Sequence, residues 1–180
     1  VTAVRQRFGR IDILFNNVGQ SARERASEFH LSTEETWRFV IEVSLLTTMR
    51  ATRLVVEEMR ARRSGRIVNM STESAFYGDV GFVDYAAAKM GVVGFTRSLA
   101  RELAPFHVNV NAVCPGYTDT DIVAAAVDNV VRRTGRSPEA AREALASRNP
   151  QQRLVSPDEV ASAVAWLCLP ESQSVNGQVI

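Results

Sequence analysis

Short apolar runs alternate with longer amphipathic stretches along this 180-residue chain. Such alternation is typical of parallel strands joined by crossover helices. The strands that it predicts are Ile11–Asn16, Arg66–Met70, Val108–Val113 and Gly177–Ile180. Because 46% of the residues are hydrophobic, the chain can bury one sizeable core, and we expect a single α/β domain over residues 1–180.

Two crossover helices are predicted between the first three strands. The first covers Thr33–Arg63, where Ser32 is expected to be the N-cap and Glu35 to complete a capping box. The second covers about Tyr85–Ala104 and connects the second and third strands. Both lengths suit crossovers in a parallel sheet.

The segment Tyr117–Arg153 is long for a connection in a parallel α/β unit. It holds its own helix start at Ser137-Pro138, so we expect it to cover the functional site. A further helix is predicted after it, capped by Ser156 and ending at about Leu169.

Charge and cysteine content narrow the class of partner. The 21 basic and 20 acidic residues give a formal charge of +1, which favours a small-molecule partner over nucleic acid or an anionic membrane. Cys114 and Cys168 stand far apart without metal-ligand spacing, so we expect no metal site and buried free thiols in a reducing cytoplasm. No apolar run approaches the roughly twenty residues that span a bilayer, and we expect a soluble cytoplasmic protein.

The basic residues hold the most informative signal: 20 are arginine and one, Lys89, is lysine. Lys89 follows Tyr85 by four residues on a predicted helix, so both side chains project from one face. An ammonium near a phenol lowers the tyrosine pKa towards the value that a general acid/base needs. The pair suits reversible alcohol oxidation with a nicotinamide as hydride acceptor. The alternative is an exposed Tyr–Lys pair on a helix surface, because this spacing alone is a weak motif.

Around this pair, four landmarks occur in one order along the chain. They are Asn16-Asn17-Val18-Gly19 after the first strand, Thr72 after the second, Tyr85 with Lys89 on the helix, and Pro115-Gly116 with Thr120 after the third. With them the whole chain resembles the short-chain dehydrogenase/reductase family, and within it the 3-oxoacyl-thioester reductases and 3-hydroxyacyl dehydrogenases. The resemblance implies the carboxyl-terminal part of a Rossmann-type doubly wound parallel sheet, and NAD or NADP as cofactor.

The resemblance also implies catalytic roles for four residues. Tyr85 would act as acid/base, and Lys89 would lower its pKa and hold the nicotinamide ribose. Thr72 stands thirteen residues before Tyr85, at the family's catalytic serine position, and keeps the hydroxyl. Ser44 replaces the asparagine that usually helps to carry a proton-relay water, so we expect an altered relay.

Two loops are implied to bind the cofactor. In the family the first lies under the adenosine, and here it comprises Asn17, Val18 and Gly19, where valine is bulkier than the usual alanine. The second holds the nicotinamide, with Thr120 on its carboxamide, and comprises Pro115, Gly116, Thr118 and Thr120. The hydroxyls of this second loop equally suit caps of the next helix.

The first residues, Val1–Phe8, read as the end of a helix, and no glycine-rich strand-to-helix turn occurs in the chain. We therefore expect both ends to be cut. A dinucleotide's phosphates need such a turn, so the alternative function is a catalytically silent fragment or scaffold. A related epimerase or dehydratase is a third possibility, against which the short length after Pro115 speaks. NAD versus NADP, the substrate and the reaction direction stay open.

Gly91 and Gly94 give the catalytic helix a small surface that implies a closely packed partner helix. The resemblance implies a homodimer or homotetramer, and packing within one subunit is the alternative. The arginines of the segment 117–153 suit an anionic thioester such as a 3-oxoacyl coenzyme A, and a solvated helix face explains them equally.

Overall fold

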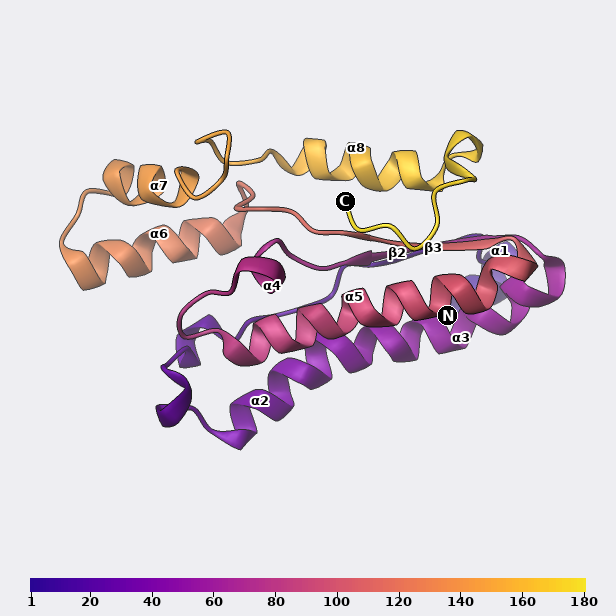
Figure 1. The fold of residues 1–180 in the computed structure, drawn as a ribbon, viewed down its shortest axis with the longest axis horizontal. Coiled ribbons are helices and arrows are strands. Elements are labelled where there is room, and N and C mark those ends of the chain that lie inside the picture. The colour runs from indigo at the N-terminus through magenta and orange to yellow at the C-terminus, as the bar shows by residue number, and fades with distance from the viewer. The chain divides into compact units, whose positions relative to one another are not determined.

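The structure, a computed structural model, describes residues 1–180 and divides into two compact units. One unit comprises Val1–Cys114 with Val164–Ile180, and the other comprises Pro115–Ala163 (Figure 1). Each has its own apolar core. The single domain expected from the sequence stays a prediction. None of the helices combines the length and the apolar character needed to cross a membrane.

The elements follow one another in the order strand, helix, strand that the sequence predicts. In the first unit they are α1 (Thr2–Phe8), β1 (Ile13–Asn16), the 3₁₀ turns η1 (Arg23–Arg25) and η2 (Phe29–Leu31), α2 (Glu34–Ile41), the π-helix η3 (Glu42–Leu46), α3 (Thr47–Arg62), β2 (Gly65–Met70), α4 (Ser74–Tyr77), α5 (Val83–Leu103), η4 (Ala104–Phe106), β3 (Val108–Val113) and η5 (Pro170–Ser172). Those that lie in or begin in the second unit are α6 (Asp121–Thr134), α7 (Pro138–Ala146) and α8 (Pro157–Cys168).

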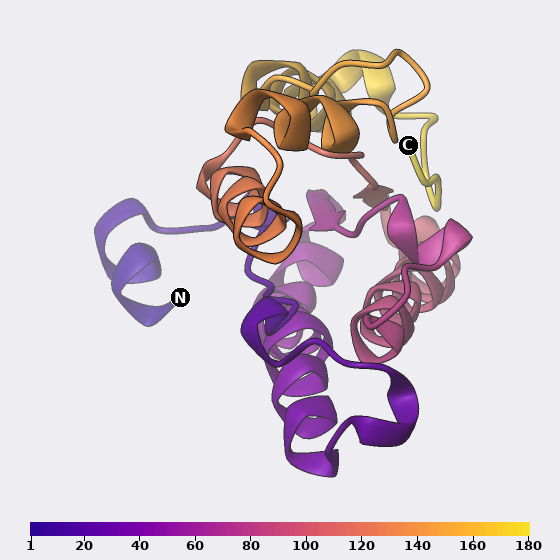
Figure 2. The same ribbon diagram turned by 90° about the vertical axis from the view of Figure 1, so that its left-hand side faces the viewer.

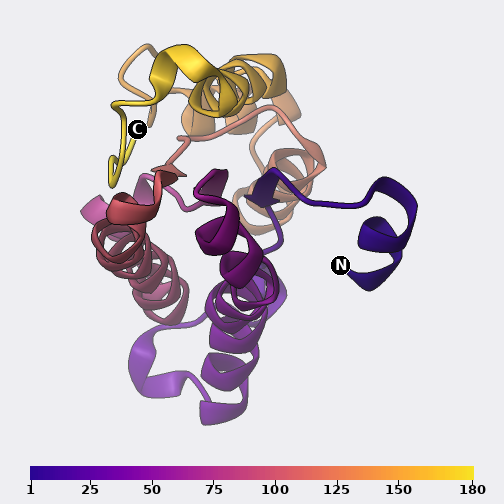
Figure 3. The ribbon, with the colours of Figure 1, turned by 90° about the vertical axis from the view of Figure 1, so that its right-hand side faces the viewer.

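A parallel three-stranded sheet in the order β1-β2-β3 forms the centre of the first unit, which confirms the predicted fold class. Helices α3 and α5 lie side by side against it (Figures 1 and 2). Met59 of α3, Leu103 of α5 and Ile67 of β2 are fully buried in this layer. Burial of each such side chain contributes about 1.5–3 kcal/mol. Helix α1 buries no residue and stands out from the rest of the unit (Figure 3).

A row of buried polar side chains crosses the same layer. Asn16 Nδ2 donates to Thr52 Oγ1 over 3.0 Å and to Asn69 Oδ1 over 2.8 Å. Asn69 Nδ2 in turn donates to Thr96 Oγ1 over 2.9 Å. The row links β1, β2, α3 and α5, and it pairs Asn16 with Asn69, its partner in the strand register. Asn16, which ends the first strand, thus bridges the ends of β1 and β2.

We expect Asn69→Ala to lower the free energy of unfolding by about 2–4 kcal/mol, because one N–H of the buried Asn16 amide loses its acceptor and the buried Thr96 hydroxyl loses its donor. The exposed Asn17 provides the matched control, and Asn17→Ala should change stability by less than about 0.5 kcal/mol. Urea unfolding followed by circular dichroism measures both. Equal stabilities for the two variants would contradict the role of the row.

The long helix predicted over Thr33–Arg63 is interrupted by the π-helix η3, which the sequence did not indicate. Its N-cap is Thr33, whose Oγ1 accepts from Thr36 N over 3.3 Å, so the prediction of Ser32 was wrong. The Ser32 hydroxyl donates to Phe29 O and accepts from Trp37 Nε1 instead.

The predicted strand Gly177–Ile180 forms only one bridge, between Val179 and Ala112 of β3. Gly177 has a φ of 73°, a left-handed conformation that lies outside the regular strand region. After it, Ala112 N donates to Gln178 O, Ile180 N donates to Ala112 O and Cys114 N donates to Ile180 O. Residues 178–180 therefore pair with β3 in parallel, as predicted, and only Gly177 departs from the predicted strand.

The small surface of α5 is used in part within the chain. A Cβ added at Gly91 would lie 2.9 Å from Leu45 Cδ2, so this glycine admits a side chain of η3. At Gly94 no atom lies within 4 Å of an added Cβ. Packing within one subunit therefore accounts for Gly91, and the homodimer or homotetramer stays a prediction.

The second unit confirms the helix starts predicted by capping residues. Ser137 Oγ accepts from Ala140 N over 3.2 Å at the start of α7, and Ser156 Oγ accepts from Glu159 N over 3.1 Å at α8. A small apolar cluster joins α6 and α7. Asn149 ties the unit together, because its side chain bonds both the N–H and the C=O of Tyr117.

Candidate active site

Tyr85 and Lys89 lie one turn apart on α5, as the sequence predicts. The ammonium of Lys89 is 5.9 Å from the centroid of the Tyr85 ring, and only 3% of the lysine is exposed. Lys89 Nζ donates to Met70 O, the last carbonyl of β2, over 2.8 Å. The pair is therefore no exposed helix-surface pair, and its cation is held against the carboxyl end of a parallel strand, where open sheets bind ligands.

Gly19 lies beside the same ammonium and near Ser44. A Cβ added at Gly19 would lie 2.8 Å from Lys89 Nζ and 3.5 Å from Ser44 Oγ, so a side chain there would displace the lysine ammonium. Ser44, which is fully buried in η3, donates to Gln20 O and accepts from Gln20 N, both over 3.1 Å. The structure thus brings together Gly19, Ser44 and Lys89, which are far apart in the sequence.

Burial dominates the electrostatics of the pair. It lowers the pKa of Lys89 from 10.5 to about 8, while the nearby Cys114 opposes this shift. Burial also raises the pKa of Tyr85, and the charge of Arg23 opposes that shift. The expectation that Lys89 lowers the tyrosine pKa is therefore corrected: the ammonium is bonded to Met70 O, and loss of hydration outweighs charge at the phenol.

Thr72 follows β2 and is half-buried. Its Oγ1 lies 3.1 Å from Ser74 Oγ. The neighbouring Ser71 is buried, and its hydroxyl donates to Lys89 O over 2.9 Å. Because the Ser71 hydroxyl is occupied in holding α5, Thr72 carries the other hydroxyl at this strand end, and Ser74 is its partner in the protein.

The two loops implied to bind the cofactor lie in different units. In the first unit, Asn17 and Val18 are exposed beyond the end of β1, and 60% of Val18 is accessible. In the second unit, Thr118 Oγ1 donates to Gly116 O over 3.0 Å. Thr120 occupies the N-cap position of α6, but its hydroxyl donates to Thr118 O instead of capping the helix.

Pro115 begins this second loop and is half-buried. Cys114, just before it, and Cys168 are free thiols, but both are only partly buried, which corrects the expectation of buried thiols. Burial raises the pKa of the Cys114 thiol.

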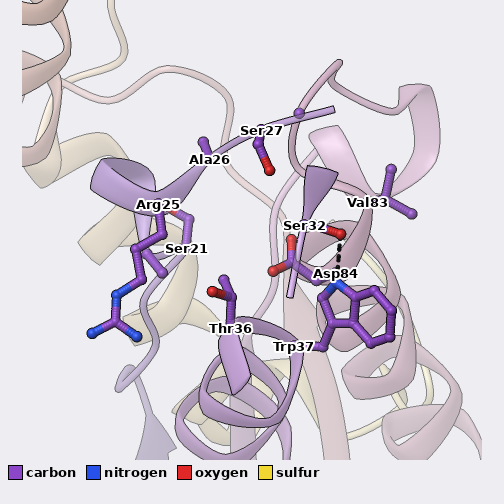
Figure 4. A pocket seen from close by; sticks show the side chains of 11 residues that line it. Ser21, Arg25, Ala26, Ser27, Ser32, Thr36, Trp37, Val83 and Asp84 are labelled. Carbon is purple, nitrogen blue, oxygen red and sulfur yellow. Dashed lines mark hydrogen bonds between the residues drawn. The ribbon is translucent and has the colours of Figure 1, made fainter. Parts of the chain in front are cut away.

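A small polar pocket opens beside the site in the first unit (Figure 4). Its wall includes Ser21, Arg25, Thr36, Trp37 and Asp84. None of the expected catalytic side chains lines it.

Sequence reasoning missed Arg23. Its guanidinium carbon lies 4.9 Å from the centroid of the Phe82 ring, and its charge acts to lower the pKa of the Tyr85 phenol. The only signal for it in the sequence is its place four residues after Gly19.

We expect the buried charge of Lys89 to make stability depend on pH. Its pKa of about 8 in the folded state lies below the unfolded value of 10.5, so the folded protein is the first to lose the proton as pH rises. Below about pH 8 the buried ammonium lowers the free energy of unfolding by its full amount. Above that pH this loss of stability disappears progressively, and it amounts to at most about 3 kcal/mol. Urea unfolding at about pH 7 and about pH 9.5 should show that wild type gains stability relative to Lys89→Met. Parallel pH dependences of the two proteins would contradict the shift.

Comparison with known proteins shows the family of the chain. A family model described as enoyl-(acyl carrier protein) reductase matches residues 1–180. The chain is 41% identical over 180 residues to a 3-oxoacyl-[acyl-carrier-protein] reductase of Thermotoga maritima, covering 100% of this chain and 68% of that protein. It is 36% identical to an acetoacetyl-CoA reductase of an Acinetobacter species, covering 96% of this chain and 64% of that protein.

A crystal structure of actinorhodin polyketide ketoreductase with NADPH superimposes with a TM-score of 0.92 at 36% identity, covering 99% of this chain and 68% of that one. The chain therefore belongs to the short-chain dehydrogenase/reductase family of NAD(P)-dependent oxidoreductases. These relatives do not favour the silent scaffold. The expectation of cut ends stays a prediction.

Proposed function

We propose that this chain carries the catalytic machinery of a reductase that converts 3-oxoacyl compounds to 3-hydroxyacyl compounds, or the reverse, with NAD or NADP. The observation that carries the proposal is the dry ammonium of Lys89, one turn from Tyr85 and beside Gly19. The names of the relatives support the substrate class, because they include 3-oxoacyl-[acyl-carrier-protein] and acetoacetyl-CoA reductases.

Tyr85 is the proton donor in this proposal. Burial raises the pKa of its phenol, so the hydroxyl keeps its proton at neutral pH in the protein alone. A protonated phenol is the form that donates a proton to a ketone oxygen as negative charge develops there. Thr72 adds a second hydroxyl donor to the same oxygen, and it has less rotational freedom than serine.

The residues around Lys89 suit a nicotinamide dinucleotide. An ammonium has three donors, and Lys89 uses one of them on Met70 O. The remaining two suit the hydroxyls of a ribose, and Gly19 leaves the backbone bare beside them. Asn17 and Val18, with Pro115, Gly116, Thr118 and Thr120 of the second unit, are the other residues assigned to the cofactor. When bound, the nicotinamide supplies or accepts the hydride.

Ser44 is a positioning residue in the proposal. Its hydroxyl fixes Gln20, and with it the loop that carries Gly19. A relay water would rest on this serine less firmly than on an asparagine, whose amide offers more hydrogen-bonding groups. The segment 117–153, with α6 and α7, is assigned to cover the substrate.

We expect Tyr85→Phe to lower kcat by roughly 10²–10⁴-fold, because it removes the proton donor. The substrate is the acetoacetyl thioester of N-acetylcysteamine, and turnover is followed by the absorbance of NADPH or NADH. Tyr77→Phe is the matched control, because Tyr77 is 84% exposed on the neighbouring α4. Nucleotide binding, followed by fluorescence, should survive both changes. A wild-type protein that binds neither nucleotide would overturn the proposal.

Thr72 distinguishes hydroxyl chemistry from packing. We expect Thr72→Ser to keep activity within about threefold and Thr72→Val, which is isosteric without the hydroxyl, to lose about a hundredfold in kcat/KM. The same reductase assay measures both variants. Equal activity of the serine and valine variants would show that the hydroxyl takes no part.

A further inference from the structure

Arg23 is held in a fixed orientation next to the start of the catalytic helix. Its guanidinium carbon lies 4.9 Å from the centroid of the Phe82 ring. Phe82 is the N-cap residue of α5, three residues before Tyr85. Stacking on an aromatic face leaves the edge of the guanidinium plane, with its N–H donors, available to a ligand.

The turn that carries Arg23 is anchored against the same helix. Ala22 is fully buried at a φ of 47°, which is unusual for a residue with a side chain. Such a conformation costs of order 1–3 kcal/mol and persists only where the surroundings fix it. Ala22 packs with Val40 and Ala88 in one cluster, and Tyr85 packs against that cluster too. Arg23 and Tyr85 are therefore positioned by shared packing.

The charge of Arg23 is not neutralised within the protein. Its Nε is shielded from solvent and makes no hydrogen bond, and no carboxylate forms an ion pair with it. Arg25, two residues later, differs: it pairs with Glu35 at 3.6 Å and lines the polar pocket (Figure 4). The two arginines of one turn thus have different contacts. Of the two, only Arg23 has a charge that acts to lower the pKa of the Tyr85 phenol.

We propose that Arg23 binds the C1 oxygen of a 3-oxoacyl substrate while Tyr85 contacts the C3 oxygen, which makes Arg23 a specificity-determining residue. This inference rests on the proposed function. The two oxygens of a 1,3-dicarbonyl group can lie on one side of the molecule, a few ångströms apart. Two neighbouring hydrogen-bond donors can then bind one oxygen each. The C1 oxygen belongs either to a neutral thioester or to a free carboxylate. A guanidinium fork donates to both, and more strongly to the carboxylate.

A site with an unpaired donor rejects a substrate that lacks the acceptor, because a polar group is then left without a partner. Arg23 accordingly favours 3-oxoacyl compounds over simple ketones. The effect of the Arg23 charge on the Tyr85 phenol is separate from this preference, because it is the same for every substrate that Tyr85 protonates.

The test compares Arg23→Gln with the matched control Arg25→Gln on three substrates. They are the acetoacetyl thioester of N-acetylcysteamine, free acetoacetate, and butanone, which has no C1 oxygen. For each protein, kcat/KM on the dicarbonyl that wild type reduces more efficiently is divided by kcat/KM on butanone. We expect Arg23→Gln to lower this ratio by about 10- to 100-fold. Arg25→Gln should keep the wild-type ratio. If wild type reduces butanone too slowly to measure, butanone is used as a competitive inhibitor and its inhibition constant takes the place of kcat/KM.

The outcomes separate the possibilities. A larger fall for acetoacetate than for the thioester identifies a free acid as the source of the C1 oxygen, and the converse identifies a thioester. An equal loss on all three substrates, with a shifted pH profile, would mean that Arg23 acts only through Tyr85 and would overturn the inference, as would an unchanged ratio. A wild type that reduces neither dicarbonyl would refute the proposed function instead.

Discussion

The hydrogen bond between the Asn16 and Asn69 side chains fixes where the loop after β1 meets the rest of the site. It joins the ends of β1 and β2 inside the layer, and Thr52 and Thr96 extend it to α3 and α5. Because the loop leaves β1 at this point, Gly19 arrives beside Lys89 and Gln20 arrives at Ser44. A set of neutral amides and hydroxyls thus determines where the one buried cation of the site lies.

The electrostatics of the site follow from limited hydration more than from pairing. Lys89 has a single protein acceptor, and its pKa falls because burial disfavours the charged form. The Tyr85 phenol shares that environment and stays protonated, with Arg23 as the charge that opposes the shift. The protein alone is therefore set for proton donation, and a polar ligand that reached the lysine would change the balance of both groups.

Local rules carried much of the fold and of the site. β3 was predicted with its exact bounds because valine and alanine recur along it at strand spacing. Every one of its residues is buried. That Tyr85 and Lys89 share one helix face followed from their spacing. The N-cap at Thr33 depends on a hydrogen bond, and the later start of the last extended segment depends on the backbone angle of Gly177; composition reveals neither.

Other features depend on tertiary packing, which the spacing of residues along the sequence does not predict. The shift of the Tyr85 pKa depends on how deeply the phenol is buried, and the place of Arg23 depends on Ala22 entering a cluster with Ala88. Neither contact is local in sequence. The approach of Gly91 to Leu45 is another such case, because the glycine alone did not say which helix would use its surface.

The π-helix at Glu42–Leu46 divides the helical span between Glu34 and Arg62 into two rods with a joint between them. A π-turn holds one residue more than an α-turn, and each residue turns a helix by about 100°. The joint therefore sets the rotation of α3 relative to α2 and turns Ser44 towards Gln20. Without the extra residue, the span would be a continuous α-helix in which the faces of α2 and α3 keep their relation. The extra residue thus serves Ser44, which would lose the place from which it bonds Gln20.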